Sequence, residues 1–280
     1  MTSDIALIGF GEAGSSFAAA GAWGARALAH DRDPARADIM RQLGVGCSDS
    51  LAGAVQDASL IVSLVTADQA LAVVRDAATL MAPGTIFCDM NSVAPQTKQA
   101  AAALIEAAGG HYVDVAVMAP VDPARLAVPL LLSGAKAGEA EARLQALGFA
   151  KTRVVGDAVG RASSIKMIRS VMVKGIEALT AECVLAAGEA DVLDEVLASL
   201  DASERARPWD TRADYNLDRM LVHGLRRAAE MEEVVKTLEG LGTGAAMTRG
   251  TVERQRAIGA LGMKVPPDGL GAKIGAITQP

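Results

Sequence analysis

The stretch DIALIGFGEAG, residues 4–14, decides the fold of the first half of the chain. An apolar run typical of a buried strand leads directly into three glycines with G-x-G-x-x-G spacing. In this pattern the first glycine permits a tight turn, the second lets the backbone approach a pyrophosphate, and the third lets the next helix pack closely. The N–H groups of that helix then face the anion. The predicted cofactor-binding residues of this turn are Gly9, Phe10, Gly11, Glu12, Ala13 and Gly14.

Strand-like and helix-like segments alternate through the first half of the chain. Strands are expected at 4–9, 26–31, 60–65, 84–89, 111–117 and 128–134, and Ala-rich helices at 13–21, 34–43, 68–80, 94–108 and 137–147. Steady alternation of this kind predicts a doubly wound, mostly parallel sheet that helices cover on both faces. The first domain is therefore predicted to be an α/β Rossmann domain that binds a dinucleotide, over residues 1–156.

The pattern changes after residue 156. Residues 159–188 contain no proline and have helical periodicity, and further helical segments follow at 191–205, 214–239 and 244–261. We therefore expect an all-α domain over residues 157–280. Its tail, PPDGLGAKIGAITQP, is predicted to be loosely ordered.

An acidic residue follows the second expected strand at the position where dinucleotide-binding domains hold the adenosine ribose. Asp31 lies 22 positions after Gly9 (31 − 9), close to the roughly 20 positions that are typical. Arg32 would attract a 2′-phosphate, whereas Asp31 and Asp33 would repel it. NAD is therefore predicted in preference to NADP. The alternative role of Arg32 is stacking on the adenine ring.

Composition excludes several other classes of protein. The net charge of −6 argues against a nucleic-acid binder, which needs a basic face. The three cysteines lack metal-ligand spacing, so we expect reduced core thiols and no metal site. No signal peptide is evident, and no apolar run reaches the roughly 18 residues of a membrane helix. These features predict a cytoplasmic protein.

The run SSIKMIRSVMVKG, residues 163–175, has the composition of a buried helix, but it contains Lys166. A buried lysine is paired, extends its amine to water, or serves chemistry. Arg169, Ser170 and Lys174 lie three, four and eight positions further along, and therefore share one stripe of the helix with Lys166. A polar stripe at the junction of two domains favours a lysine that serves chemistry.

Three segments together resemble the β-hydroxyacid dehydrogenase superfamily, which includes 3-hydroxyisobutyrate and 6-phosphogluconate dehydrogenases. These segments are GFGEAG (9–14), DMNSVAP (89–95) and GRASSIKMIRS (160–170). The resemblance implies that Lys166 is the catalytic acid/base and that Asn91 contacts the nicotinamide. It also implies that Val65 and Thr66 lie beside the nicotinamide ribose and that the substrate is a small anionic hydroxyacid or carbonyl compound. The all-α domain over residues 157–280 would then bind this substrate and form a homodimer.

The sequence departs from the superfamily at positions that touch substrate. Ser170 stands where an asparagine is usual, and Met118, Ala119 and Pro120 replace a Ser-Gly-Gly loop. That loop thereby loses a hydroxyl and, at Pro120, an amide donor, since proline has no N–H. Val173 occupies the place of the second acid of the decarboxylating branch. The predicted substrate residues are Ser92, Met118, Ala119, Pro120, Arg169, Ser170 and His223.

Two of these residues keep alternative roles. Arg169 would clamp a substrate carboxylate or phosphate, or instead form a salt bridge. His223 would orient the substrate, or instead pack at an interface. The leading functional hypothesis is an NAD(P)-dependent dehydrogenase that interconverts a small hydroxyacid and its oxo form. The alternatives are an imine reductase, which often lacks the superfamily lysine, an oxidative decarboxylase, and a non-catalytic nucleotide sensor.

Overall fold

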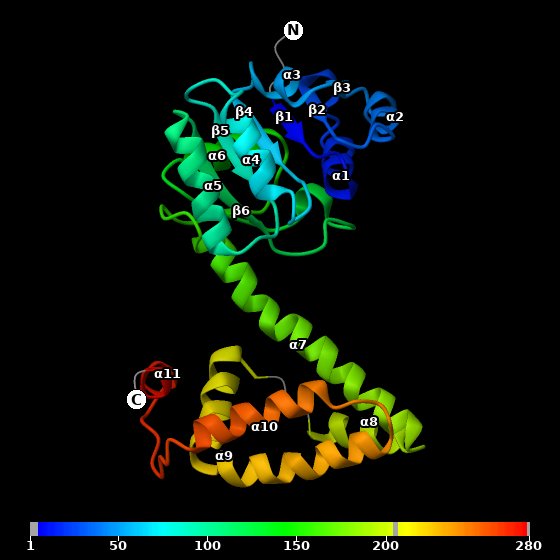
Figure 1. The fold of residues 1–280 in the computed structure, drawn as a ribbon, viewed down its shortest axis with the longest axis vertical. Coiled ribbons are helices and arrows are strands. Elements are labelled where there is room, and N and C mark those ends of the chain that lie inside the picture. The colour runs from blue at the N-terminus through cyan, green and yellow to red at the C-terminus, as the bar shows by residue number, and fades with distance from the viewer. Residues whose placement is uncertain (1–4, 204–206, 279–280) are drawn as a thin grey trace. The chain divides into compact units, whose positions relative to one another are not determined.

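The computed structural model describes residues 5–203 and 207–278, apart from the side chains of residues 177, 230, 233 and 236. The ends of the predicted segments 4–9, 191–205 and 266–280 therefore lie outside the described residues. The chain divides into two compact units, residues 1–170 and residues 171–280. Each unit is described by itself (Figure 1).

Unit 1 is built on one eight-stranded sheet. Its strands are β1 (Ile5–Ile8), β2 (Ala27–His30), β3 (Gly46–Cys47), β4 (Leu60–Ser63), β5 (Ile86–Asp89), β6 (His111–Val117), β7 (Leu130–Ser133) and β8 (Thr152–Gly156). Their order is β3-β2-β1-β4-β5-β6-β7-β8, and among the described residues every pairing is parallel except that between β6 and β7. Strand order reverses between β1 and β4, where dinucleotides bind in such sheets. The predicted Rossmann-type fold is confirmed.

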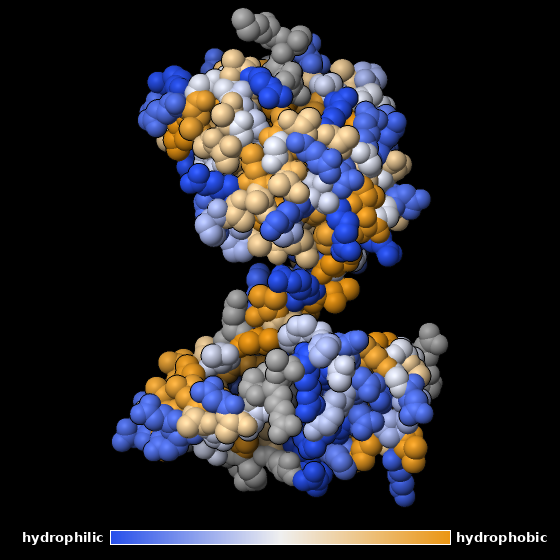
Figure 2. Space-filling model, turned by 180° about the vertical axis from the view of Figure 1, so that it is seen from behind, coloured by the Kyte–Doolittle hydropathy of each residue, from blue (hydrophilic) through white to orange (hydrophobic). Residues whose placement is uncertain are grey.

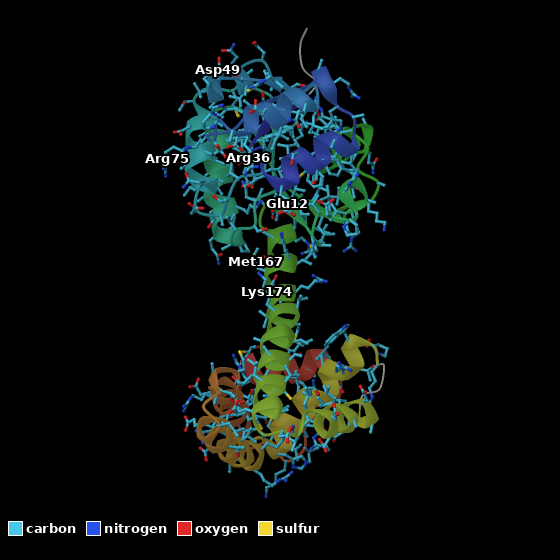
Figure 3. The ribbon with its side chains drawn as sticks, turned by 90° about the vertical axis from the view of Figure 1, so that its right-hand side faces the viewer. Glu12, Arg36, Asp49, Arg75, Met167 and Lys174 are labelled. Atoms are coloured by element: carbon cyan, nitrogen blue, oxygen red, sulfur yellow. The ribbon has the colours of Figure 1, made fainter. Side chains whose placement is uncertain are left out.

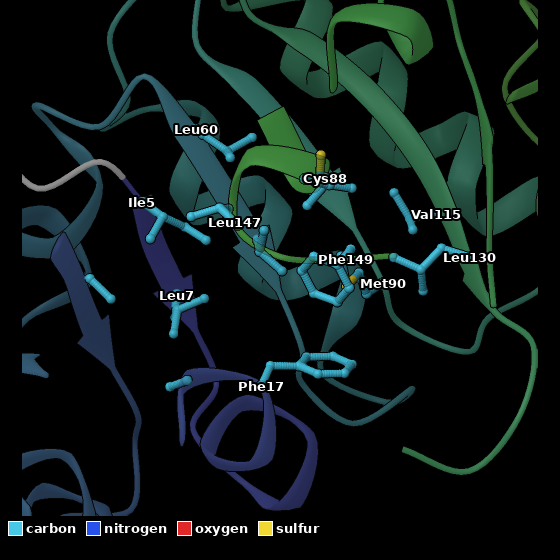
Figure 4. Close-up of a cluster of buried hydrophobic side chains, with 14 of the residues drawn as sticks. Ile5, Leu7, Phe17, Leu60, Cys88, Met90, Val115, Leu130, Leu147 and Phe149 are labelled. Carbon is cyan, nitrogen blue, oxygen red and sulfur yellow. The ribbon is translucent and has the colours of Figure 1, made fainter. Parts of the chain in front are cut away.

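Helices cover both faces of this sheet. They are α1 (Glu12–Ala20), α2 (Arg36–Gln42), α3 (Leu51–Val55), α4 (Ala70–Ala78), α5 (Pro95–Ala107) and α6 (Ala137–Ala146), with short 3₁₀ turns η1 (Gly24–Arg26) and η2 (Arg125–Ala127). Phe17, Met40 and Leu144 bring α1, α2 and α6 onto one face, part of which Figure 4 shows. Val55, Val74 and Ile105 anchor α3, α4 and α5 on the other. Because both faces are covered, β1, β4 and β5 are buried throughout.

Sequence patterns missed three elements of unit 1. β3 has only two residues, α3 has five, and β8 begins Thr-Arg and is partly exposed at the sheet edge. None of the three carries the uninterrupted apolar run by which the central strands were predicted. The two missed strands, β3 and β8, form the two edges of the sheet.

Unit 2 consists of helices joined by short turns and loops, with no strand among its described residues. Helix α7 (Arg161–Glu189) begins in unit 1 and continues into unit 2, followed by α8 (Leu193–Ser203), α9 (Trp209–Gly240), α10 (Ala246–Gly259) and α11 (Leu270–Thr278). Helices α9 and α10 cross closely, because a Cβ on Gly224 would lie 2.4 Å from the carbonyl oxygen of Gln255. The expectation of a loosely ordered tail was wrong for α11, whose Lys273 is buried.

The expectation of a buried helix over residues 163–175 was also wrong in part. Ile168 and Val171 are 71% and 70% exposed, and Met172 and Val173 are exposed too. Apolar side chains of this part of α7 are therefore exposed in the part of the chain that the structure describes. Hydrophobic side chains are accordingly visible along α7 at the surface (Figure 2).

Candidate active site

The glycine turn after β1 has the geometry that a dinucleotide pyrophosphate requires. Gly9 has φ +91°, and a Cβ there would lie 2.7 Å from the carbonyl oxygen of Leu64. A Cβ on Gly14 would lie 2.7 Å from the carbonyl oxygen of Gly9. A Cβ on Gly11, at the N-terminus of α1, would meet nothing within 4 Å. Gly9 and Gly14 therefore close the turn, and Gly11 leaves space for a phosphate at the helix N-terminus.

Asp31 braces this turn from the neighbouring strand. Its Oδ2 accepts a hydrogen bond from the Phe10 N–H at 2.6 Å, and its Oδ1 accepts one from the Asp33 N–H at 2.8 Å. The Phe10 side chain is fully buried in the core. Phe10 was predicted to bind cofactor, but its side chain does not line the cavity, so its contribution lies in the turn itself.

A cavity of about 750 Å³ adjoins the turn. Its lining includes Gly9, Gly11, Asp31, Arg32, Asp33, Arg36, Val65, Thr66 and Gln69. Arg32 donates a hydrogen bond to the Gln69 side-chain oxygen at 2.7 Å. Arg36 forms a 3.3 Å ion pair with Asp33. The size suits a nucleotide, and the predicted adenosine-side residues meet here.

A second cavity of about 450 Å³ lies on the other side of the turn and shares Leu64, Val65 and Thr66 with the first. Its lining also includes Glu12, Ala13, Asn91, Ser92, Ala119, Pro120 and Lys166. Lys166 Nζ donates a 2.5 Å hydrogen bond to Ser92 Oγ. Two segments that are 74 residues apart in sequence (166 − 92) thus meet at one point.

Asn91 lines the second cavity and holds a buried hydrogen-bond acceptor. Its backbone N–H donates to Asp89 Oδ1 at 2.8 Å, and its Nδ2 donates to Ser63 Oγ at 2.9 Å. The side chain is 5% exposed, and its Oδ1 has no hydrogen-bond partner among the described residues. Because an unpaired buried acceptor is costly, this oxygen is suited to a donor on a ligand.

The remaining predicted substrate residues are Met118, Arg169, Ser170 and His223, and none of their side chains is among those named in the cavity lining. Arg169 Nη1 lies 3.4 Å from the carbonyl oxygen of Met118, which ties α7 to the substrate loop, while the Met118 side chain packs against Ala162 and its neighbours. The Ser170 hydroxyl donates to the carbonyl oxygen of Lys166 at 3.0 Å, so it serves the helix. His223 is an exposed residue of α9, in unit 2.

Sequence patterns missed a set of buried polar residues behind the second cavity. Ser63, Asp89, Asp114 and Ser133 occupy paired positions on four adjacent strands, and each is at most 1% exposed. We call them the polar row. Lys98 of α5 is 1% exposed and lies 3.0 Å from Asp89. The available signal was two aspartates within otherwise apolar strands.

No cluster of three or more metal-binding side chains occurs in the part of the chain that the structure describes, and none of its helices is long and apolar enough to cross a membrane. The described site consists of a glycine turn, two adjoining cavities and a lysine–serine pair.

These features define a class, the dinucleotide-binding oxidoreductases with a helical second domain. Residues 4–156, more than half of the chain, match the family described as the NAD binding domain of 6-phosphogluconate dehydrogenase. The chain belongs to this family and is an NAD(P)-dependent oxidoreductase. Residues 187–258 match a second family, a domain of unknown function named DUF1932.

Three solved structures illustrate the likeness. A conserved hypothetical protein from Sinorhizobium meliloti is 37% identical, covers 100% of this chain and 97% of its own, and has a TM-score of 0.62. A conserved protein described as structurally similar to 3-hydroxyacid dehydrogenases is 27% identical, with coverage of 91% and 96% and a TM-score of 0.61. An imine reductase from Myxococcus stipitatus in complex with NADP⁺ is 20% identical, with coverage of 92% and 94% and a TM-score of 0.74. At that identity the last likeness concerns the fold alone.

Proposed function

We propose that this oxidoreductase interconverts a small hydroxyacid and its oxo form, with Lys166 as the acid/base. The contact between Lys166 Nζ and Ser92 Oγ carries the proposal, because it places an ionisable amine in the cavity next to the glycine turn. Superfamily resemblance and the relative described as similar to 3-hydroxyacid dehydrogenases support the same chemistry.

The residues that line the two cavities would have different roles in this reaction. A bound nicotinamide supplies or accepts a hydride at the substrate carbon. Lys166 removes the hydroxyl proton during oxidation and returns it during reduction. Ser92 holds the amine through its hydroxyl and is itself exposed to the cavity. Asn91 offers its unpaired Oδ1 to a donor on the ligand, and Arg169 holds the loop at Met118 that borders the site.

The test is nicotinamide reduction by purified protein over a panel of 2- and 3-hydroxyacids with NAD and NADP. Lys166→Ala is expected to reduce kcat by about 10²- to 10⁴-fold, the contribution of a positioned acid/base. Lys174→Ala is the matched control, since Lys174 lies eight residues further along α7 and is exposed (Figure 3). Equal turnover in Lys166→Ala and wild type would contradict the role of Lys166.

Imine reduction is the second candidate. The observation that favours it is the loop at Ala119 and Pro120, which lines the cavity with side chains that cannot form hydrogen bonds. A cavity of this kind suits an apolar imine better than a carboxylate. The imine reductase from Myxococcus stipitatus, which has a similar fold, is consistent with this candidate. This candidate would be selected if cyclic imines cause oxidation of NADPH or NADH while hydroxyacids cause no reduction of NAD or NADP.

We infer a preference for NAD from the adenosine side of the site. The Asp31 carboxylate accepts a hydrogen bond from the Phe10 N–H of the glycine turn. Asp33 lines the first cavity together with Asp31. A 2′-phosphate would meet the Asp33 carboxylate. Asp33→Asn is expected to improve the ratio of kcat/KM for NADP over NAD by about tenfold, which corresponds to about 1.4 kcal/mol. Steady-state kinetics with both cofactors measures this ratio, and an unchanged ratio would contradict the inference.

We propose further that the protein is a homodimer. The exposed apolar side chains of α7, Ile168 and Val171 above all, form the kind of surface that a second copy covers. Solution mass by light scattering is the measurement. A double variant, Ile168→Glu with Val171→Glu, is expected to give a monomer. A monomeric wild type at micromolar concentration would contradict the proposal.

A further inference from the structure

We propose that Lys98 is a positioning residue that fixes the geometry of Lys166 and Ser92 through the polar row. Lys98 does not line either cavity, so it acts through other groups. The inference rests on the proposed function, because it assigns the support of the proposed acid/base. This role would explain why the charged amine of Lys98 is buried, with 1% of the residue exposed.

The polar row connects the two halves of the active site. Ser63 pairs with Asp89, Asp89 with Asp114, and Asp114 with Ser133, each across one strand boundary. Residues paired side by side in a sheet point to the same face. The row therefore runs across β4 to β7, with the active-site loop at one end and the start of α7 at the other.

One end of the row holds the loop that carries Ser92. Asp89 Oδ1 accepts from the N–H of Asn91, and Ser63 Oγ accepts from the Asn91 side chain. Tyr112 donates its hydroxyl to Asp89 Oδ2 at 2.5 Å. Burial, and then the charge of Asp89, raise the pKa of Tyr112 far above its usual range, so its hydroxyl remains a donor. Ser92 follows Asn91 directly, so its position depends on these bonds.

The other end of the row fixes the start of α7. Asp114 Oδ2 accepts hydrogen bonds from the N–H groups of Gly160 and Ser163 and from the Ser163 hydroxyl, at 2.9–3.2 Å. Ser133 Oγ accepts from the Ala162 N–H at 3.0 Å. A carboxylate at a helix N-terminus satisfies orphan amides and opposes the positive end of the helix dipole. Lys166 lies only three residues after Ser163, less than one turn away.

Lys98 joins the two ends. Its Nζ lies 3.0 Å from Asp89 Oδ1 and 3.6 Å from Asp114 Oδ1, and it donates to the carbonyl oxygen of Asp89 at 2.6 Å. All three side chains are at most 1% exposed. Two enclosed carboxylates repel one another strongly, because no water screens them. Without the ammonium group, Asp89 and Asp114 in the middle of the row would move apart, and the contact between Lys166 and Ser92 would change with them.

The experiment compares Lys98→Met with Lys273→Met. Lys273 is also a buried lysine between two aspartates, but it belongs to unit 2. Lys98→Met is expected to lower kcat by about 10- to 100-fold, the effect of misplacing reacting groups by about 1 Å. Its dissociation constant for NADH is expected to stay within about twofold of wild type, because Lys98 does not line the cofactor cavity. Lys273→Met is expected to leave kcat unchanged.

Tyr112→Phe is the variant that keeps the fold. It removes only the hydroxyl bonded to Asp89, and the ring still stacks on Phe87 with centroids 6.0 Å apart. Its kcat is expected to fall in the same direction as that of Lys98→Met and by a smaller factor. If Lys98→Met does not fold, this variant decides the proposal, and a wild-type kcat in Tyr112→Phe would overturn it.

A second readout needs no turnover. The rate of acylation of Lys166 by a small reagent, measured by mass spectrometry relative to Lys174, reports the surroundings of the amine. In Lys98→Met or Tyr112→Phe this ratio is expected to change by about threefold or more, and in Lys273→Met it is expected to stay constant. If the substrate panel gives no turnover, the proposed function fails, and this ratio still tests the positioning. An unchanged ratio would overturn it.

Discussion

Two buried lysines, one in each unit, pair with two aspartates each, and their surroundings differ. Lys98 meets Asp89 and Asp114, which come from different strands and are 1% and 0% exposed. Lys273 of α11 meets Asp214 and Asp218, which lie one turn apart on α9 and are 36% and 46% exposed. Water can replace a lost partner in the second group and cannot in the first. The enclosed group therefore fixes geometry, whereas the open group mainly attaches a helix.

The largest expected effect that tests this comparison is the loss of stability in Lys98→Met. Removing one partner of a buried ion pair typically costs about 3–5 kcal/mol, because the remaining charge stays buried without compensation. Urea denaturation of both lysine variants measures the free energy of unfolding. Lys273→Met is expected to lose clearly less, since its aspartates regain water. Equal losses in the two variants would remove the distinction between the groups.

A smaller effect is expected at Glu182, which extends the comparison to a partly buried helix start in unit 2. Burial raises the pKa of this carboxyl, but hydrogen bonds from the Thr248 side chain and the N–H groups of Met247 and Thr248 outweigh it, so the net pKa is lowered. Because Glu182 caps α10 as Asp114 caps α7, Glu182→Ala is expected to cost about 1–2 kcal/mol at neutral pH.

The pH dependence of the Glu182 contribution has a definite sign. A group whose pKa is lower in the folded state stabilises the fold above its unfolded pKa of about 4.3, and this contribution is lost as the pH falls further. The difference in melting temperature between wild type and Glu182→Gln is therefore expected to shrink as the pH falls below about 4. A difference that persists at low pH would show that charge plays no part in the cap.

The smallest effect is expected at Lys273 in alkaline solution. The hydrogen bond to Asp214 raises the pKa of Lys273 above its ordinary value, despite burial. Its contribution is therefore present below the unfolded pKa of about 10.4 and is lost as the pH rises through the folded value. The gap in melting temperature between wild type and Lys273→Met is expected to close only above that pH. A gap that closes between pH 7 and 9 would contradict the pairing.

The sequence predicted most of the fold because its central strands are apolar on both faces and follow one another between Ala-rich helices. It missed β3, α3 and β8, which lie near the edges and carry little of this signal. It also placed apolar residues of α7 in a core, although Ile168 is exposed. Helical periodicity does not say what covers a face.

The candidate site was predicted where residues are local in sequence and missed where they meet across strands. Lys166, Ser92 and Asn91 stand in recognisable segments, and the structure brings them to one cavity. Lys98 stands in an Ala-rich helix, where a lysine normally faces solvent. Asp89 lies beside Asp114 because of the registers of β4 to β7, and the register between two strands cannot be predicted from the sequence of either strand alone.

The burial of the polar row in the sheet has a consequence for how the substrates of related enzymes can change. The row is bonded to the start of α7 and to Asn91, whereas Ala119 and Pro120 are exposed residues on a loop. Loop changes at exposed positions cost little in folding free energy. Under the proposed function, substitutions in this loop can therefore change the choice of substrate while Lys166 keeps its position. Relatives that share the fold and the lysine would then accept different molecules.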